Sequence, residues 1–369
     1  MTPRVARWKV DAEMQSTAPV QQIQVGLSDA AYTIFIGDFN PDALQGMERG
    51  VCAIITNPRV GKLYARRVAA FLRANGYTPR VIEIPDGEKY KTLDTARAVY
   101  DRLIDARLDR RSTIFALGGG VVGDLAGLVA ATFLRGVPFV QIPTTLLAMV
   151  DASIGGKVAA NLPRGKNLIG AFKQPRAVII DPNTLATLPD TEWRAGMAEV
   201  IKHGIIGDVG PFEMLERGNW KSEIGSWIGR AIKVKVEIVT RDPFEQGERL
   251  KLNLGHTFAH ALEKLSNYRL RHGEAVAIGL ICAARLAARL ELSVPALTAR
   301  IENLLRATGL PTHVPRDISA PALYAAMTTD KKRAGARIRF VLPRTLGDVV
   351  ITDAASRADV LTAIKETRE

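Results

Sequence analysis

The residues best suited to chemistry lie in the stretch 252–274, LNLGHTFAHALEKLSNYRLRHGE, which holds three of the five histidines of the chain. His256 and His260 are four residues apart in a segment with a helical apolar period, so we expect both rings on one face of one turn. This is the spacing at which a helix offers two imidazoles to a divalent metal, although no glutamate lies between them as in HExxH. His272 follows a polar break and can fold back as the first residue of a second helix. The alternative is a chance cluster of surface or core histidines.

A candidate carboxylate partner occurs upstream, in the segment AEVIKH. Glu199 lies there in an apolar helical stretch, where a lone carboxylate is costly unless it is paired or bound to a cation. Together with His256 and His272 it would form a set of two histidines and one carboxylate. Such a set leaves positions open for a substrate and suits zinc in a catalytic role.

A glycine-rich turn, GGGVVGD, fills residues 118–124 between an expected strand and an expected helix. The GxGxxG spacing in this context suggests that free N–H groups at the start of the helix hold a pyrophosphate. However, the next strand ends without an acidic residue for a ribose hydroxyl, so a dinucleotide is expected to bind in a manner that differs from the ordinary Rossmann one. The alternative is a turn that serves only helix–sheet packing.

Other segments offer groups for an anionic ligand at the ends of neighbouring strands. DGEKYK at 86–91 and the pair Thr144-Thr145 each follow an expected strand, although either alone could be a cap or a turn. DASIGGK at 151–157 and RGKN at 164–167 carry lysines and an asparagine among small residues, which suits an anion. A solvated hairpin is the alternative there. Arg135 adds a guanidinium nearby in the sequence.

The elements that would position these groups follow an α/β rhythm from residue 21 onward. Two short strands are expected in QIQVG (22–26) and YTIFIG (32–37). Apolar strands then alternate with amphipathic helices, which is typical of a Rossmann-like, doubly wound, mostly parallel sheet. The strands are expected at 51–56, 81–84, 113–117, 139–142 and 177–181, and the helices at 59–74, 92–106 and 122–133. After residue 189 the pattern is mainly helical, with a strand pair at 337–342 and 348–351 before a last helix. We therefore expect a flexible extension (1–20), an α/β domain (21–189) and a mainly α-helical domain (190–369).

Composition narrows the function classes. The apolar fraction of 47% is that of an ordinary globular protein, and no signal peptide or membrane-spanning run is evident, so a cytoplasmic protein without a membrane partner is expected. Cys52 and Cys282 lie in apolar surroundings without a CxxC motif, which predicts buried thiols in a reducing compartment. The net charge of +12 raises the possibility of nucleic-acid binding. Because the basic residues are dispersed, a small anionic substrate is the better interpretation, and no nucleic-acid partner is expected.

The combination of motifs resembles the 3-dehydroquinate synthase family. GGGVVGDLAG, PTTLLAMVDASIGGK, GKNLIGAF, GMAEVIKHG, LNLGHTFAHALE, HGEAVAIG and DKK…RFVLP occur here in the family's order, over roughly residues 20 to 365. The resemblance implies a dehydroquinate synthase-like fold, a homodimer, NAD, and one divalent metal, zinc or cobalt. The implied substrate is a small sugar phosphate, 3-deoxy-D-arabino-heptulosonate 7-phosphate. The implied reaction is a transient oxidation by NAD, loss of phosphate, return of the hydride and an intramolecular aldol closure to 3-dehydroquinate.

The resemblance also implies roles for individual residues. The metal ligands would be Glu199, His256 and His272. The candidate catalytic residues would be His260, Lys202, Asp151, Lys235 and Arg249. The groups that bind the substrate phosphate would be Arg135, Lys157, Asn167 and Asn253, with Lys331 or Lys332. The groups that bind NAD would be Asp86, Gly87, Glu88, Lys89, Tyr90, Lys91, Gly120, Val121, Val122, Gly123, Asp124, Thr144, Thr145, Lys157, Lys166, Thr184, Leu185, Ala186 and Thr187.

Three departures from the family pattern leave every named ligand in place: Val158 for a usual threonine, Ala259 for a common glycine and His203 for a common tyrosine. Other sugar-phosphate cyclases, which make an inosose or a valiolone, are the nearest alternatives, because they share the fold and cofactors. A metal-dependent polyol dehydrogenase is a second alternative. A basic nucleic-acid-binding module is a third, from another class.

Overall fold

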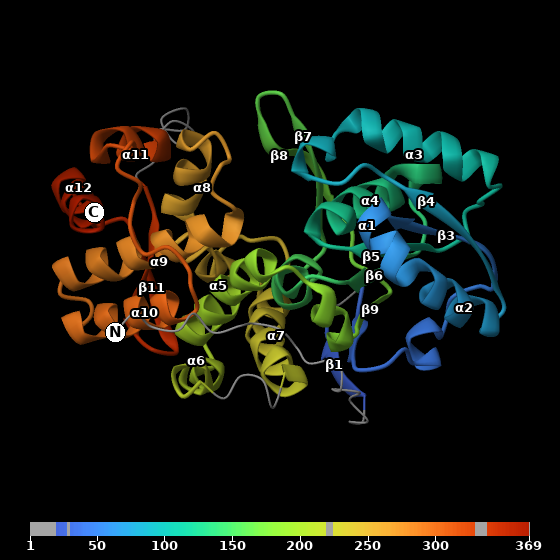
Figure 1. Ribbon diagram of the computed structural model, residues 1–369, viewed down its shortest axis with the longest axis horizontal. Helices are drawn as coiled ribbons and strands as arrows, with labels where there is room; N and C mark the ends of the chain where they lie inside the picture. The colour runs from blue at the N-terminus through green and yellow to red at the C-terminus, as the bar shows by residue number, and fades with distance from the viewer. Residues whose placement is uncertain (1–19, 28–29, 219–223, 329–337, 369) are drawn as a thin grey trace. The chain divides into compact units, whose positions relative to one another are not determined.

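The computed structural model describes residues 20–27, 30–218, 224–328 and 338–368 (Figure 1). The expectations for the extension before residue 20 and for Lys331 and Lys332 lie outside these residues. The described chain divides into two compact units between Leu188 and Pro189. The first unit carries the sheet, and the second is mainly helical.

Seven strands of the first unit, among the residues described, form one sheet in the order β1-β2-β9-β6-β5-β3-β4. Only the β1–β2 pair is antiparallel; the other neighbours are parallel. β5, β6 and β9 are buried at every position, as expected of parallel strands that are covered on both faces. The mostly parallel, doubly wound sheet predicted from the sequence is therefore confirmed. The strands are β1 (Gln21–Val25), β2 (Tyr32–Ile36), β3 (Gly50–Thr56), β4 (Tyr77–Glu83), β5 (Ile114–Gly118), β6 (Phe139–Pro143) and β9 (Ala177–Ile180).

Helices cover both faces of this sheet, because alternate strand residues belong to two separate apolar cores. Ala53 and Ile55 pack with α3 (Leu93–Asp105) and α4 (Gly120–Thr132) on one face. Cys52 and Ile54, from the same strand, pack with α2 (Arg66–Ala74) on the other. Cys52 is fully buried, as is Cys282 in the second unit, so the prediction of buried thiols is confirmed.

Three parts of the first unit differ from the elements expected. The strand expected at 81–84 is β4, which begins four residues earlier, at Tyr77. The helix expected at 59–74 consists of α1 (Pro58–Val60), a π-helical segment η2 (Gly61–Ala65) and α2. The lysine-bearing segments after residue 156 form an antiparallel hairpin, β7 (Lys157–Leu162) and β8 (Gly165–Phe172), which the sequence had left open. Short helical turns complete the unit: η1 (Pro41–Leu44), η3 (Glu88–Tyr90), η4 (Phe133–Arg135), η5 (Ala148–Ala152) and η6 (Pro182–Thr187).

The second unit is built around α9 (His272–Arg289), whose buried residues lie on most of its circumference. α5 (Asp190–Ile206), α8 (His256–Leu265), α10 (Pro295–Ala307) and α12 (Arg357–Glu366) pack against it, together with strand β10. The other elements are α6 (Val209–Glu216), α7 (Ile224–Arg241), η7 (Glu248–Asn253), α11 (Ala320–Thr328), β10 (Phe340–Thr345) and β11 (Asp348–Thr352). The predicted mainly helical region and the antiparallel strand pair near its end are confirmed. Across the described residues, no helix combines the length and the apolar character that a membrane span needs.

Candidate functional site

Three helices of the second unit bring Glu199, His256 and His272 together. Glu199 lies in the middle of α5, whereas His256 and His272 are the first residues of α8 and α9. The expectations that His256 and His260 share a helix and that His272 begins the next one are both confirmed. The positions of both imidazoles are therefore fixed by the first turns of the two helices and not by loops.

Glycines allow these helix starts to approach their neighbours closely. A Cβ atom at Gly273, next to His272, would lie 2.2 Å from the carbonyl oxygen of Ala195 in α5. A Cβ atom at Gly279 would lie 2.2 Å from the carbonyl oxygen of Gly255, the residue before His256. Gly255 itself has a φ of +78°, a conformation that other residues rarely adopt. A side chain at any of these positions would collide with neighbouring backbone, so the glycines permit the close approach of the helices that carry the histidines.

The donor atoms of the three side chains face one another. Oε1 of Glu199 lies 3.4 Å from Nε2 of His272 and 3.8 Å from Nε2 of His256. All three donor atoms lie within 4.8 Å of one another, and Glu199 is fully buried. Two ligands at ~2.1 Å from a tetrahedral zinc ion are separated by about 3.4 Å. The donor set and its spacing therefore fit a small divalent cation.

The second ring nitrogen of each histidine also has a neighbour. Nδ1 of His256 lies 3.2 Å from the carbonyl oxygen of Leu254, and Nδ1 of His272 lies 3.6 Å from Oε2 of Glu263. Such contacts fix the ring orientation and leave Nε2 to the cation. Glu263 was not among the predicted residues. Its signal in the sequence was its position seven residues after His256, on the same face of α8.

The two histidines differ in their affinity for a proton. Burial, together with the charge of Lys202, lowers the pKa of His256 to about 3. Burial also lowers the pKa of His272, but hydrogen bonds to Glu199 and Glu263 outweigh it and raise that pKa to about 9. A cation that binds here at neutral pH therefore has to displace a proton from His272 rather than from His256.

At the carboxyl edge of the parallel sheet, the glycine-rich turn begins α4. No side chain of the described residues caps this helix, so its first N–H groups are available to an anion. The packing interpretation also has support. A Cβ atom at Gly118 would lie 2.7 Å from Val122, and one at Gly119 would lie 3.0 Å from Thr145. The glycines therefore serve helix–sheet packing and an open helix start at the same time.

The segment after β4 contacts this turn. Lys91 is buried, and its Nζ lies 2.6 Å from Oδ2 of Asp124 and 3.8 Å from Oε1 of Glu88. Asn161 of the hairpin donates from Nδ2 to Oε1 of Glu88 at 2.8 Å. Asn57, directly after β3, donates to Oδ1 of Asp86 at 2.9 Å. Both asparagines were missed in the sequence. Asn57 could have been found from its place at the end of a strand, before a proline.

Comparisons with known proteins decide the family. Models described as 3-dehydroquinate synthase N-terminal and 3-dehydroquinate synthase C-terminal match residues 81–195 and 196–333. The chain belongs to the 3-dehydroquinate synthase family. The 3-dehydroquinate synthase of a Synechococcus species is 50% identical over 309 residues, which are 81% of this chain and 84% of that protein.

Two solved structures of related cyclases are similar over nearly the whole chain. The 2-epi-5-epi-valiolone synthase from Streptomyces hygroscopicus subsp. jinggangensis, with NAD+ and Zn2+ bound, has a TM-score of 0.85 and 27% identity, and the match covers 93% of this chain and 98% of that one. A 2-deoxy-scyllo-inosose synthase complexed with carbaglucose-6-phosphate, NAD+ and Co2+ has a TM-score of 0.83 and 25% identity, and the match covers 94% and 100%. The dehydroquinate synthase-like fold is therefore confirmed.

The remaining polar residues that the family resemblance singled out in the second unit are mostly buried. Lys202 forms an ion pair with Oε2 of Glu199, the oxygen that does not face the histidines. The His260 ring centroid lies 5.4 Å from that of His256 and 6.4 Å from that of His272. Lys235 and Arg249 are also buried. Lys202 and Glu199 thus offset each other's charge in the interior, as buried charges usually do.

Asn253 and Arg249 lie in the turn η7, where backbone and side-chain contacts hold them. Nδ2 of Asn253 donates to Oε1 of Glu245 at 3.0 Å. The Arg249 guanidinium donates to the carbonyl oxygen of Pro243, and its backbone N–H donates to Asp242. Glu245 was not predicted either, and its contact with Asn253 places it beside a residue that the family resemblance assigns to phosphate binding.

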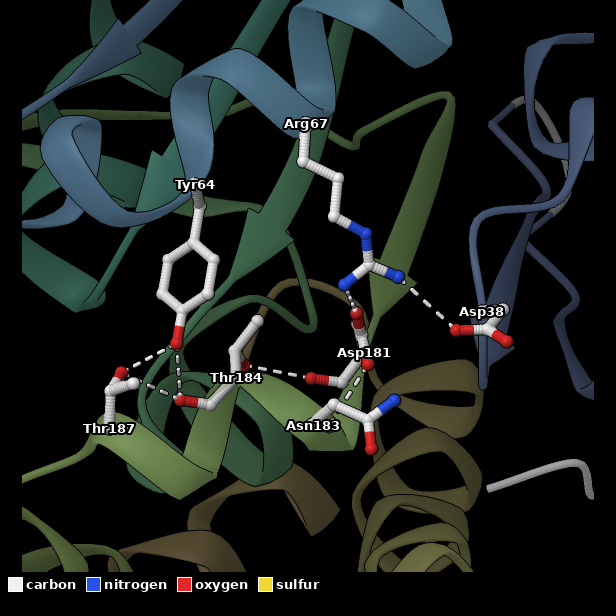
Figure 2. Close-up of polar contacts among 7 residues, drawn as sticks. All are labelled: Asp38, Tyr64, Arg67, Asp181, Asn183, Thr184 and Thr187. Atoms are coloured by element: carbon white, nitrogen blue, oxygen red, sulfur yellow. Dashed lines mark hydrogen bonds and ion pairs between the residues drawn. The ribbon is translucent and has the colours of Figure 1, made fainter. Parts of the chain in front are cut away.

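The first unit of the chain holds the other residues that the family resemblance predicts to bind substrate or NAD. Asp151 lies in η5, Arg135 in η4, and Lys157 begins β7. Lys166 and Asn167 lie in β8. Asn167 has a φ of +55°, a left-handed conformation that most residues other than glycine adopt only with strain. Thr144 and Thr145 follow β6, and residues 184–187 lie in η6 (Figure 2). The structure therefore places the predicted NAD-binding segments at the ends of β4, β5, β6 and β9.

Proposed function

We propose that this chain is a 3-dehydroquinate synthase, which converts 3-deoxy-D-arabino-heptulosonate 7-phosphate to 3-dehydroquinate and phosphate. The observation that carries the proposal is the cluster of Glu199, His256 and His272 in a chain whose two halves match the two models of this family. The enzyme would be a phosphate-eliminating carbon–oxygen lyase of the shikimate pathway, and thus of aromatic amino acid biosynthesis.

The proposed cofactors are NAD and one zinc or cobalt ion, because the two solved relatives contain NAD+ with Co2+ or Zn2+. When bound, NAD accepts and returns a hydride, and the cation polarises the substrate hydroxyl and the later carbonyl. Glu199, His256 and His272 would hold the cation through the donor atoms that face one another. Glu263 and the carbonyl of Leu254 would keep the two imidazoles oriented.

We propose that His260 moves protons beside the cation, since its ring lies next to both metal-binding rings. Lys202, Lys235 and Arg249 would bind the carboxylate and hydroxyls of the substrate. Their positive charge supports this role, because ammonium and guanidinium groups suit carboxylate and hydroxyl oxygens, and Lys202 already pairs with Glu199 at the proposed cation site. Asp151 is proposed to contact the sugar near the cation.

Phosphate binding is proposed for a second set of residues: Arg135, Lys157, Asn167 and Asn253, with Lys331 or Lys332. Guanidinium and ammonium groups suit phosphate oxygens, and Lys157 is exposed at the start of its strand, where an anion can reach it. Holding the phosphate fixes the orientation of the sugar, which is a large share of the catalytic task when elimination and ring closure are partly intrinsic to the substrate.

NAD is proposed to bind along the carboxyl edge of the parallel sheet. Residues 86–91, 120–124, 144–145 and 184–187 follow the ends of four strands, the place where ligands of such sheets collect. The start of α4 would receive the pyrophosphate. Lys157 and Lys166 of the hairpin would add positive charge.

The organisation of the protein is part of the proposal. The NAD-binding domain would be 21–189, the metal- and substrate-binding domain 190–369, and residues 1–20 a flexible extension. A homodimer in the cytoplasm is proposed, without a nucleic-acid partner. The exposed apolar side chains of Leu168, Ile169 and Phe172 on β8 support a second copy as the neighbour of this hairpin. Sedimentation of the purified protein tests the dimer, and a filter-binding assay at low salt tests the nucleic-acid expectation.

The deciding experiment measures phosphate release from 3-deoxy-D-arabino-heptulosonate 7-phosphate with NAD, before and after treatment with a chelator. We expect release that stops without metal, returns when zinc or cobalt is added back, and is accompanied by no net NADH. Sedoheptulose 7-phosphate and glucose 6-phosphate serve as comparison substrates. Faster turnover of either would favour a valiolone or inosose synthase, and net NADH formation would favour a polyol dehydrogenase.

A further inference from the structure

The turn η6, which follows β9, is held at both ends by side chains from a helix more than a hundred residues earlier in the chain (Figure 2). This turn carries Thr184 to Thr187, the last of the segments proposed to bind NAD. The turn has hydrogen bonds of its own, such as the Thr184 N–H to the carbonyl oxygen of Asp181 at 3.1 Å and the Thr187 hydroxyl to that of Thr184 at 3.3 Å. The side chains of the earlier helix add contacts from outside the turn.

Tyr64 holds the far end of the turn. Its hydroxyl lies 3.0 Å from the carbonyl oxygen of Thr184 and 2.5 Å from Oγ1 of Thr187. The carbonyl oxygen of Thr184 can only accept, and it lies within reach of both hydroxyls, since the Thr187 hydroxyl is 3.3 Å from it; between the two hydroxyls either one can donate. Burial raises the pKa of Tyr64, which keeps its hydroxyl protonated at neutral pH.

Arg67 holds the near end. Its guanidinium lies 2.7 Å from Oδ2 of Asp181 and 3.2 Å from Oδ1 of Asp38, and it stacks on the ring of Phe39 at 4.9 Å. Asp181 is buried and is the N-cap of the turn, since its Oδ1 accepts from the backbone N–H of Asn183 at 2.9 Å. Burial raises the pKa of Asp181, and the Arg67 guanidinium opposes that rise while it holds the capping carboxylate in place.

Tyr64 and Arg67 are three residues apart on one helical run, so both face the turn. Tyr64 belongs to the π-helical segment η2, and segments of this kind occur frequently at functional sites. Neither residue belongs to a glycine-rich or phosphate-binding motif. Their shared task is therefore structural support for one particular turn, and that turn lies at the edge where NAD is expected.

We propose that Tyr64 and Arg67 are positioning residues that hold the turn η6 in the shape that binds NAD. The inference rests on the proposed function, because it needs NAD at this edge of the sheet. A turn that is already ordered loses less conformational entropy when the cofactor binds, so its support contributes to NAD affinity without touching the reacting atoms.

The test is Tyr64→Phe, which keeps the ring and removes the hydroxyl. The matched control is Tyr100→Phe, because the Tyr100 hydroxyl also contacts a threonine, Oγ1 of Thr132 at 2.7 Å, between α3 and α4. In the metal-loaded enzyme we expect the Kd and KM for NAD to rise roughly five- to tenfold in Tyr64→Phe, the loss of about one net hydrogen bond. The kcat at saturating NAD, the KM for the sugar phosphate and the metal content should stay within about twofold of the wild type, whereas Tyr100→Phe should change none of them.

A second variant, Arg67→Ala, should also raise the Kd for NAD and leave kcat at saturating NAD unchanged. Equal NAD affinity in Tyr64→Phe and the wild type would overturn the inference. So would a fall in kcat or metal content equal to the change in NAD affinity, because that pattern indicates general loss of structure. If the wild-type protein itself binds no NAD, the proposed function fails. This result differs from equal NAD affinity in the variant and the wild type, which overturns only the role of Tyr64 and Arg67.

Discussion

Two regions of the molecule are built in different ways: the histidine cluster of the second unit (Glu199, His256 and His272) and the nucleotide edge of the first. The nucleotide edge is the carboxyl edge of the parallel sheet, with residues 86–91, 120–124, 144–145 and 184–187. In the cluster, the groups proposed to bind the cation are three side chains on three helices, and the carboxylate is fully buried. At the edge, the groups proposed to bind NAD are largely turns and helix N–H groups at the ends of four strands. The cluster depends on the chemical type of each residue, whereas the edge depends on the shape of the backbone.

This difference predicts how each region tolerates change. Each donor in the cluster is one of three, so its loss removes a large fraction of the binding energy for a cation. At the edge many N–H groups would share the proposed NAD, so removal of one supporting contact should change NAD affinity by a smaller, graded amount. Substitutions in the two regions test this contrast, from the largest expected effect to the smallest.

Glu199→Gln should give the largest effect, because it replaces the charged oxygen that is proposed to bind the cation with the two histidines. We expect loss of bound metal and a fall in kcat of about a thousandfold, as several kcal/mol of transition-state stabilisation disappear. Elemental analysis and the phosphate-release assay provide the measurements. Stoichiometric zinc in the purified variant would contradict the assignment of Glu199 as a ligand.

Glu263→Gln should lower the affinity for the cation without removing any of the three proposed ligands. Its carboxylate lies beside Nδ1 of His272, and loss of such an outer contact typically reduces metal affinity or activity by about 10- to 100-fold. Competition with a chromogenic chelator measures the affinity. Glu302→Gln is the matched control, since Glu302 pairs with Arg285 and Arg306 elsewhere in the same unit. Equal affinities in the two variants would show that the Glu263 contact has no role in metal binding.

Lys157→Ala tests the charged part of the first unit. If Lys157 binds the substrate phosphate, we expect the KM for the sugar phosphate to rise about tenfold or more and turnover to fall, the usual consequence of losing a hydrogen bond to a charged group. Lys264→Ala removes the same charge from an exposed position on α8 and controls for the change in net charge. Kinetics of Lys157→Ala that match those of the control would exclude Lys157 from the site.

The contrast also explains how much the sequence could predict. The spacing of His256 and His260, the helix start at His272 and an apolar helix around Glu199 were enough to propose the cluster, because residue type and helical period define it. The alternation of buried strands and helices was likewise enough for the doubly wound sheet. Glu263 was missed because its contact with His272 depends on how α8 and α9 pack, which spacing alone does not specify.

At the nucleotide edge the sequence predicted which segments bind NAD, but it did not predict the side chains that hold those segments in place. Nothing in a single sequence links Tyr64 or Arg67 to a turn that lies more than a hundred residues later, because tertiary packing creates that contact. The π-helical segment η2 was missed for a related reason: its residues have the pattern of an ordinary amphipathic helix. The sequence did not decide between a loop and the hairpin β7–β8, because glycines and lysines suit both a loop and an exposed strand pair.

Asp208→Ala should give the smallest functional effect and separates stability from both sites. Asp208 caps α6 by accepting from the backbone N–H of Gly210 at 3.0 Å, and its two oxygens accept from Arg230 at 2.6 and 2.7 Å. We expect a loss of about 1–2 kcal/mol in the free energy of unfolding at pH 7, with unchanged metal and NAD affinity. Hydrogen bonds from Arg230 lower the pKa of Asp208 below its ordinary value of 3.8, so the stabilisation is complete above that value and disappears as the pH falls through the lowered one. The difference in urea midpoint between variant and wild type should therefore shrink below about pH 4. A difference that persists undiminished at pH 2 would mean that the packing of the side chain, and not its charge, supports the helix.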